Sequence, residues 1–142
     1  MLEIGRGWKP IAPAGGCCVC DARDVAAAIL RAAESDIECG REFILGGENW
    51  TYKDLWKEMA QRMGKPGPLF RAGPLQRWIG GACGDLWSLL ANESDLNSAG
   101  IRMTRQYHWY DSSRARSELE YRNRDVRESL DDAAAWIRAH HV

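Results

Sequence analysis

Two short apolar runs, each followed by a helix with a polar cap, constrain most strongly what this chain folds into. The first run is Cys17–Asp21, and a carboxylate of Asp21 or Asp24 is placed to cap the next helix. The second run is Glu42–Leu45, and the helix after it is expected to begin near Thr51. Short strands that are followed by capped helices predict a mixed α/β fold.

The other segments predict mainly loops and helices, with one more short strand. The final helix has the clearest pattern, because a capping box of Asp125 and Glu128 precedes apolar residues at helical spacing. The remaining expectations are a loop over residues 1–16, a connector over 65–74, a helix over 75–90, a turn or short helix over 92–100, a strand over 107–110 and a helix over 111–120. The fold class is therefore α/β, mainly helical with a few short strands.

Length and charge exclude several classes of protein. With 142 residues, the chain is expected to form a single domain over 1–142. With a net charge of -1, the chain has no excess of positive charge of the kind that binds nucleic acid. No apolar run reaches the roughly 20 residues of a membrane span, and no secretory signal is evident, so we expect a cytoplasmic protein.

Five cysteines raise the question of a metal site. Three of them, Cys17, Cys18 and Cys20, lie close together, but the other cysteines and histidines lack the paired spacing of a zinc site. Adjacent strand residues also point to opposite faces, which separates Cys17 from Cys18. We expect buried strand cysteines and no metal.

Four segments resemble, in order, the NAD-dependent epimerase/dehydratase family of extended short-chain dehydrogenases/reductases. The closest similarity is to its dihydroflavonol-reductase-like and sugar-epimerase-like branch. The first two resemble the family's "GG…VDVRDVA" and "GERYILGGENLT" segments, and the last two its "DSSKA…ELGY" and "ESLxDTxxW" segments. In this sequence they are Gly15–Ala26, Gly40–Thr51, Tyr110–Tyr121 and Arg127–Trp136.

The resemblance implies that the chain corresponds to the C-terminal, substrate-side half of such an enzyme. The Rossmann domain, which binds NAD or NADP in the family, would contain a glycine-rich turn between a strand and a helix. Gly5–Gly7 is followed by Trp8, Lys9 and Pro10, and the glycines at 80–84 follow no strand, so neither matches. We therefore expect no cofactor-binding residue in this chain.

The family's proton-transfer pair, a Tyr followed four residues later by a Lys, is also missing. The residues four after the tyrosines at 52, 107, 110 and 121 are Trp56, Asp111, Arg114 and Asp125. A lysine one helical turn away would lower the pKa of the phenol, and none is placed to do so. We expect no catalytic residue, and the chain alone is predicted to be incompetent for hydride transfer.

Ligand-binding candidates lie just before the segment that resembles "DSSKA", where sugar-nucleotide members of the family hold their ligand. Arg102 and Arg105 could grip a phosphate, and His108 or Trp109 could lie against a base or sugar. The alternative is a solvated loop with two surface arginines. Lys9 is a weaker candidate of the same kind.

Clustered charges and paired histidines elsewhere have simpler interpretations. Asp21, Arg23 and Asp24 are expected to cap a helix and form a local ion pair. The terminal His140–His141 pair is interpreted as a frayed helix end. Of seven tryptophans, Trp56 and Trp136 are expected in the core, and the other five are too many to bury in one small core.

Three functions remain open. The chain could be a catalytically silent part of a reductase or epimerase, a free-standing module that binds a sugar nucleotide or other small ligand, or a dimerising interaction protein. Its partner would be a second copy or a separate Rossmann-type protein, held by the surface that faces the Rossmann domain in the family. Two departures from the family motif are notable: Arg114 replaces a Lys, and Glu120 replaces a Gly that often adopts positive φ at a helix end.

Overall fold

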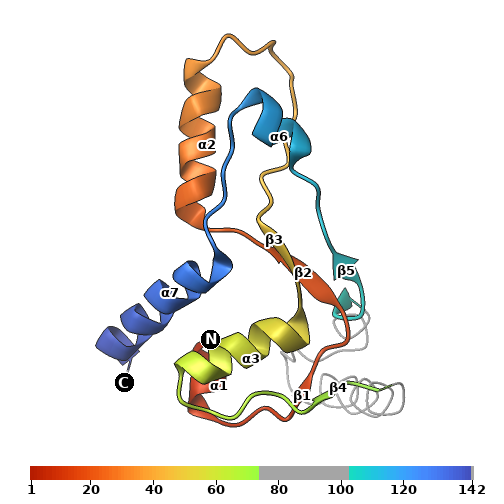
Figure 1. Ribbon diagram of the computed structural model, residues 1–142, viewed down its shortest axis with the longest axis vertical. Coiled ribbons are helices and arrows are strands. Elements are labelled where there is room, and N and C mark those ends of the chain that lie inside the picture. The colour runs from red at the N-terminus through yellow and green to blue at the C-terminus, as the bar shows by residue number, and fades with distance from the viewer. Residues whose placement is uncertain (74–102, 142) are drawn as a thin grey trace, which may run out of the picture. The chain divides into compact units, whose positions relative to one another are not determined.

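The computed structural model describes residues 1–73 and 103–141, and it has a mixed α/β fold (Figure 1). The chain divides into two compact units. Unit 1 comprises Met1–Gly16 and Thr51–His108, and unit 2 comprises Cys17–Trp50 and Trp109–Val142. The helix expected over 75–90 and the turn or short helix expected over 92–100 lie outside the described residues.

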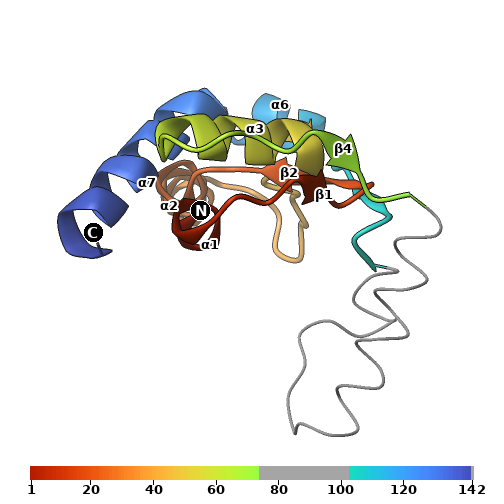
Figure 2. The same ribbon diagram turned by 90° about the horizontal axis from the view of Figure 1, so that it is seen from below.

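In its described residues, unit 1 combines two helices with short strands. Its elements are α1 (Leu2–Arg6), β1 (Ile11–Ala12), α3 (Tyr52–Arg62), β4 (Phe70–Arg71) and β5 (Tyr107–His108). β1 and β4 pair in parallel, with Ile11 opposite Phe70 and Ala12 opposite Arg71. α1 lies beside α3 in both ribbon views (Figures 1 and 2). The buried apolar side chains are those of Ile4, Ala12, Leu55 and Ala60.

α3 begins where its capping residues predict. The Thr51 hydroxyl accepts a hydrogen bond from the Asp54 backbone N–H at 3.2 Å and donates one to the Asp54 carboxylate at 2.5 Å. Both contacts lie within four residues, so local sequence alone is enough to predict this helix start. The helix ends at Arg62, two residues before Gly64, which has a φ of +65°.

Unit 2 contains the two longest of the helices that the structure describes. Its elements are β2 (Gly16–Val19), α2 (Ala22–Glu34), β3 (Glu48–Thr51), α6 (Ser113–Glu118) and α7 (Val126–His141). Gly16, the first residue of β2, and Thr51, the last residue of β3, belong to unit 1. Within this unit, β3 lies next to β2 in a sheet. A core cluster of Ala28, Ala115 and Tyr121 is joined by the partly buried side chains of Phe43 and Leu45.

α7 follows the predicted helical pattern but begins differently from a capping box. Val126, Leu130, Ala134 and Ile137 are buried on one face, as their spacing predicts. The Asp125 carboxylate accepts from the Arg127 N–H at 2.7 Å, whereas the expected partner was the Glu128 N–H. The cap is therefore present, with its hydrogen bond one residue earlier.

Two expectations for the N-terminal half are wrong. The first sixteen residues are not all loop, because α1 and β1 form there. Gly5 lies where an added Cβ would be 2.6 Å from Met63 Cε, so the glycine permits close packing of α1 on α3. Glu42–Leu45 does not form a strand, and the strand begins instead at Glu48.

Two expectations for α7 are also wrong. Trp136 is 55% exposed and not in the core, since it lies away from the face formed by Ala134 and Ile137. His140 and His141 remain helical. The His140 ring stacks on the Trp136 ring with centroids 4.7 Å apart, and its Nδ1 is 2.8 Å from the Trp136 carbonyl oxygen. These contacts give the last turn an order that the sequence did not suggest.

Candidate functional site

The predicted ligand segment is exposed where the structure describes it, from Met103 to Tyr110. Arg105 is exposed, His108 is half-buried, and Trp109 is 50% exposed. The Arg105 side chain makes no hydrogen bond or ion pair with any other residue in ranges 1–73 and 103–141. Arg102, the fourth candidate, lies outside the described residues. The boundary between the two units falls between His108 and Trp109, so Arg105 and His108 belong to unit 1 and Trp109 belongs to unit 2.

In unit 1, the backbone around Arg105 is held by two glycines. The Gly15 N–H donates to the Thr104 carbonyl at 2.9 Å, and the Gly16 N–H donates to the Gln106 carbonyl at 3.2 Å. A Cβ at Gly15 would lie 2.2 Å from the Gln106 carbonyl oxygen. The backbone is thus fixed on both sides of Arg105 while its guanidinium is left in solvent, which suits capture of an anion.

In unit 2, side chains hold the residues that follow Trp109. The Asn49 amide donates to the Tyr110 carbonyl at 3.4 Å and accepts from the Tyr110 N–H at 3.3 Å. The buried Ser112 hydroxyl accepts from the Gly46 N–H at 2.8 Å and donates to the Gly46 carbonyl at 3.0 Å. These hydrogen bonds between side chains and backbone take the place of the backbone hydrogen bonds that two paired strands would form. They fix the path of residues 110–112.

Asp111 connects this segment to α6. Its carboxylate accepts from the Ser113 backbone N–H at 3.0 Å and from the Ser113 hydroxyl. Hydrogen bonds from Ser113, first the side chain and then the backbone, lower the pKa of Asp111. Asp111 therefore serves the start of the helix and stays ionised, which makes it a poor general acid or base near neutral pH.

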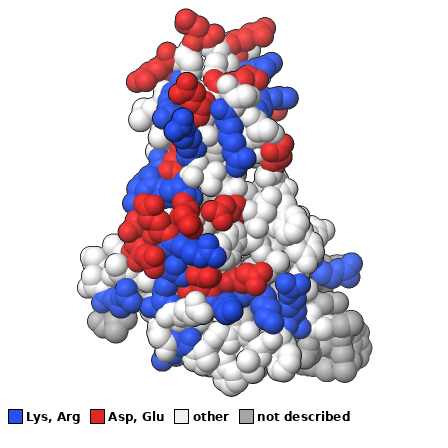
Figure 3. Space-filling model, viewed as in Figure 1, with Lys and Arg blue, Asp and Glu red and all other residues white. Residues whose placement is uncertain are grey.

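The clustered charges at the start of α2 have a structural role, as expected. Asp21 accepts from the Arg23 N–H at 2.8 Å, and the Arg23 guanidinium also contacts Asp21 and Asp132, each at 2.7 Å. Hydrogen bonds from the Arg23 and Ser129 side chains lower the pKa of Asp21 far below its usual range. Figure 3 shows acidic and basic side chains interspersed over the region of α2 and α7.

A second charged contact joins α2 to the segment before α7. Asp24 is buried, and its carboxylate accepts from the Arg124 Nε at 2.9 Å, the Arg124 Nη2 at 2.8 Å and the Arg124 backbone N–H at 2.8 Å. Burial raises the pKa of Asp24, but the hydrogen bonds from Arg124 outweigh burial and leave the pKa lowered. Sequence reasoning did not find this pair, since its members are one hundred residues apart.

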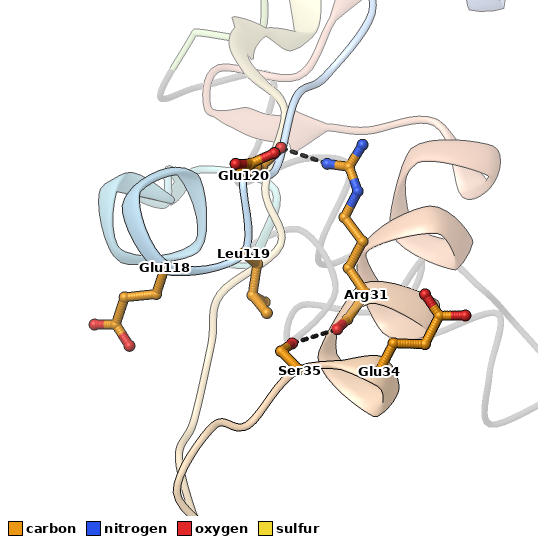
Figure 4. A pocket seen from close by; sticks show the side chains of 6 residues that line it. All are labelled: Arg31, Glu34, Ser35, Glu118, Leu119 and Glu120. Atoms are coloured by element: carbon orange, nitrogen blue, oxygen red, sulfur yellow. Dashed lines mark hydrogen bonds between the residues drawn. The ribbon is translucent and has the colours of Figure 1, made fainter.

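An open hollow of about 320 Å³ lies on unit 2 and was not suggested by the sequence (Figure 4). Its lining residues come from the end of α2 and the end of α6: Arg31, Glu34, Ser35, Glu118, Leu119 and Glu120. Arg31 donates to the Glu120 carbonyl, and Glu118 pairs with Arg41 at 2.7 Å. The charged side chains of Arg31 and Glu118 are therefore already paired within the fold, which leaves them less able to bind a ligand.

The cysteines give no sign of a metal centre in the part of the chain that the structure describes. Cys17, Cys18 and Cys20 are free, and no group of three His, Cys, Asp or Glu residues within 1–73 and 103–141 is arranged to hold an ion. Burial first, and then the neighbouring Cys18, raises the pKa of the Cys17 and Cys20 thiols. Within the same residues, no helix has the length and apolar character required to span a membrane.

Comparisons with known proteins connect the chain to a reductase. No protein-family model matches it. It is 28% identical to the protein named "Putative dihydroflavonol 4-reductase" from Synechocystis sp. (strain ATCC 27184 / PCC 6803 / Kazusa), over 99% of this chain and 42% of that protein. It is also similar to the crystal structure of gox2253, with a TM-score of 0.75 and 26% identity, over 99% of this chain and 42% of that one.

The chain is therefore similar, along nearly its whole length, to part of a larger reductase-like protein. It spans about two fifths of the length of each protein it matches. The expected mixed α/β fold is confirmed. The predicted ligand residues at 102, 105, 108 and 109 stay predictions.

Proposed function

We propose that this chain supplies the substrate-side part of a reductase of the NAD-dependent epimerase/dehydratase kind. The proposal rests on the match to a protein named as a reductase, which covers 99% of this chain at 28% identity. The matching TM-score of 0.75 extends that similarity to the fold. The sequence contains neither a glycine-rich dinucleotide turn nor a Tyr-x-x-x-Lys pair. These two absences favour the substrate-side part of such an enzyme over the cofactor-binding part.

Under this proposal, NAD or NADP binds to a Rossmann-type part outside these residues, and this chain alone binds neither. The test is a titration of the purified chain with NADH and NADPH, followed by nucleotide fluorescence and by quenching of its tryptophans. We expect no saturable change up to millimolar nucleotide. Saturation at micromolar nucleotide would contradict the proposal, because the cofactor site would then lie within this chain.

The ligand segment is proposed to hold an anionic part of the substrate. Arg105 supports this, because its guanidinium is exposed and unengaged among the described residues while the backbone around it is fixed by Gly15 and Gly16. Trp109, which belongs to unit 2, is a separate candidate with half of its surface exposed, and its ring face is proposed to contact a base or sugar. A nucleoside diphosphate sugar carries the anionic group that Arg105 would bind.

The measurement is a calorimetric titration of the chain with UDP-glucose. A charge-assisted contact contributes roughly 1.5–3 kcal/mol, so Arg105→Ala should weaken binding on the order of tenfold to a hundredfold. Arg122→Ala is the matched control, since Arg122 is also an exposed arginine. Equal affinities of the two variants for UDP-glucose would show that Arg105 does not contribute to binding.

A further inference from the structure

The two units carry opposite charge, although the chain as a whole is nearly neutral. Unit 1 has ten Lys and Arg residues against six Asp and Glu residues, whereas unit 2 has nine against fourteen. The net charge of -1 therefore combines an excess of four positive charges in unit 1 with an excess of five negative charges in unit 2. A partner attracted to unit 1 by its charge would be anionic.

Part of the positive charge of unit 1 lies on lysines that have no acidic partner. Two of the three acidic side chains in its described residues pair with arginines, as Glu3 does with Arg6 at 2.8 Å and Glu58 with Arg62 at 2.6 Å. The third caps α3 together with the preceding threonine. Four lysines make no ion pair with any residue that the structure describes: Lys9, Lys53, Lys57 and Lys65.

Contacts with the segment that leads from α3 to β4 bring lysines and apolar side chains together. This segment runs back along α3 in both ribbon views (Figures 1 and 2). Trp8 donates from its Nε1 to the Gly67 carbonyl at 3.3 Å, and Lys53 donates from its Nζ to the Leu69 carbonyl at 2.9 Å. A Cβ added at Gly67 would lie 3.2 Å from Lys57 Cγ. Three separate stretches of unit 1 thus meet at one place.

The surface formed at this place combines exposed apolar area with positive charge. Trp8 is 51% exposed and Leu69 is 55% exposed. The lysines at 9, 57 and 65 are exposed as well. The alkyl stem of a lysine can cover apolar area while its ammonium group reaches an anion. The lysine–tryptophan surface is defined by Trp8, Lys9, Lys53, Lys57, Lys65 and Leu69.

The composition of the lysine–tryptophan surface fits a lipid bilayer better than a protein or a nucleic acid. Lysine is depleted from protein–protein interfaces. The aliphatic side chain of Leu69 offers no ring on which a base of a nucleic acid could stack. A bilayer accommodates both kinds of side chain, because apolar side chains enter its headgroup region while lysines contact anionic headgroups.

We propose that the lysine–tryptophan surface binds the surface of an anionic lipid bilayer. Trp8 and Leu69 enter the headgroup region, and the four lysines lie against the lipid phosphates. Unit 2, with its excess of negative charge, is repelled by the same bilayer, so the chain binds through unit 1. This binding is independent of the proposed function, since it requires neither a cofactor nor a substrate.

The experiment is co-sedimentation of the full chain with lipid vesicles. One vesicle contains phosphatidylglycerol and phosphatidylcholine in equal parts, and the other contains phosphatidylcholine alone. Each lysine near an anionic bilayer contributes roughly a fivefold gain in partitioning, so we expect binding to the anionic vesicle to be at least tenfold stronger. Raising the salt concentration to about 0.5 M should remove most of this difference.

Variants locate the binding surface. The double variant Lys57→Glu/Lys65→Glu should weaken partitioning onto anionic vesicles at least tenfold. Trp8→Ser and Leu69→Ser, each checked for an unchanged urea midpoint, should weaken it about threefold or more, because each removes apolar area from the headgroup region. Arg122→Glu is the control, since it reverses an exposed positive charge in unit 2 and should change partitioning less than twofold.

Three outcomes would overturn the proposal. The first is equal partitioning onto the two vesicles, or a loss in Arg122→Glu as large as that in the double lysine variant. The second is binding to a single-stranded oligonucleotide that is tighter than binding to anionic vesicles and is lost in the same lysine variant. The third is self-association that the lysine variant abolishes, without vesicle binding, which would assign the surface to a second copy of the chain.

Discussion

Arg31 donates a hydrogen bond from its guanidinium to the main-chain oxygen of Glu120, with 2.5 Å between Nη1 and that oxygen. Glu120 is also the non-glycine residue with positive φ in the described ranges, at +50°. The left-handed turn lets the Tyr121 N–H bond back to the Ala115 carbonyl at 3.1 Å. Arg31 thus fixes a strained turn after α6, at the position where the resembled family has glycine.

Replacing Glu120 with glycine should stabilise the protein. A side chain in the left-handed region costs roughly 1–2 kcal/mol, and part of this gain is lost to the greater freedom of glycine in the unfolded chain. We expect Glu120→Gly to raise the free energy of unfolding by about 1 kcal/mol in urea denaturation. Ala135→Gly, at an exposed position within α7, is the control and should lower it by about 1 kcal/mol. A loss of stability in Glu120→Gly would contradict the strain argument.

Asp24 and Arg124 should make a large contribution to stability. Asp24 is 8% exposed, and Arg124 meets its carboxylate with two guanidinium nitrogens and a backbone N–H. Removing one member of such a pair leaves the other with an uncompensated charge. We expect Asp24→Asn to lower the free energy of unfolding by about 3 kcal/mol at pH 7. Asp36→Asn, at an exposed position just after α2, should change it by less than about 0.5 kcal/mol.

The same carboxylates predict how stability depends on pH. The pKa of Asp21 and that of Asp24 are lowered in the folded state, so folding is favoured when both groups are ionised. Their contribution is complete above the unfolded pKa of about 4, and it is lost as pH falls through the lower folded values. Urea unfolding at pH 7, 4 and 2.5 should show a loss confined to the acid range, and Asp24→Asn should show a smaller loss. Equal losses in the two proteins would exclude Asp24 as a source.

Local sequence was sufficient for the helix starts and insufficient for the contacts that join distant segments. The cap of α3 by Thr51 and that of α2 by Asp21 involve residues no more than three apart; the first was predicted, and the second was one of two predicted candidates, Asp21 or Asp24. The Asp24–Arg124 pair spans one hundred residues, and nothing in either segment indicates it. Phe43–Leu45 has the residue types of a strand, but a strand also requires a neighbouring backbone, which the described residues do not supply.

The candidate site was predicted from resemblance and not from a motif with its own chemistry. Arg105 and Trp109 are exposed, while the residues that bond to the backbone of their neighbours Thr104 and Tyr110, namely Gly15 and Asn49, come from distant parts of the sequence. The hollow lined by Arg31 and Glu118 could not be predicted at all, since the two lie almost ninety residues apart.

Gly47 is required by a close approach of two backbone segments. An added Cβ would lie 1.9 Å from the Val19 carbonyl oxygen, and backbone cannot move aside as a flexible side chain can. We expect Gly47→Ala to lower the free energy of unfolding by about 3 kcal/mol or more, measured by urea denaturation. Gly7→Ala is the control, because nothing lies within 4 Å of its added Cβ and its φ of -170° suits any residue. Similar effects of the two substitutions would contradict the close approach.

Ser112 should be more important for stability than Ser113, although they are adjacent. Ser112 is 2% exposed, and its hydroxyl is the partner of both the N–H and the C=O of Gly46. Ser112→Ala leaves two buried backbone groups without that partner, so we expect a loss of about 2 kcal/mol in the free energy of unfolding. The Ser113 hydroxyl bonds only to the exposed carboxylate of Asp111, and Ser113→Ala should cost less than about 0.5 kcal/mol. Because the Ser112 bonds also anchor one end of Phe43–Leu45, Ser112→Ala should speed amide exchange at Gly46, and an unchanged rate there would show that the hydroxyl does not hold this segment.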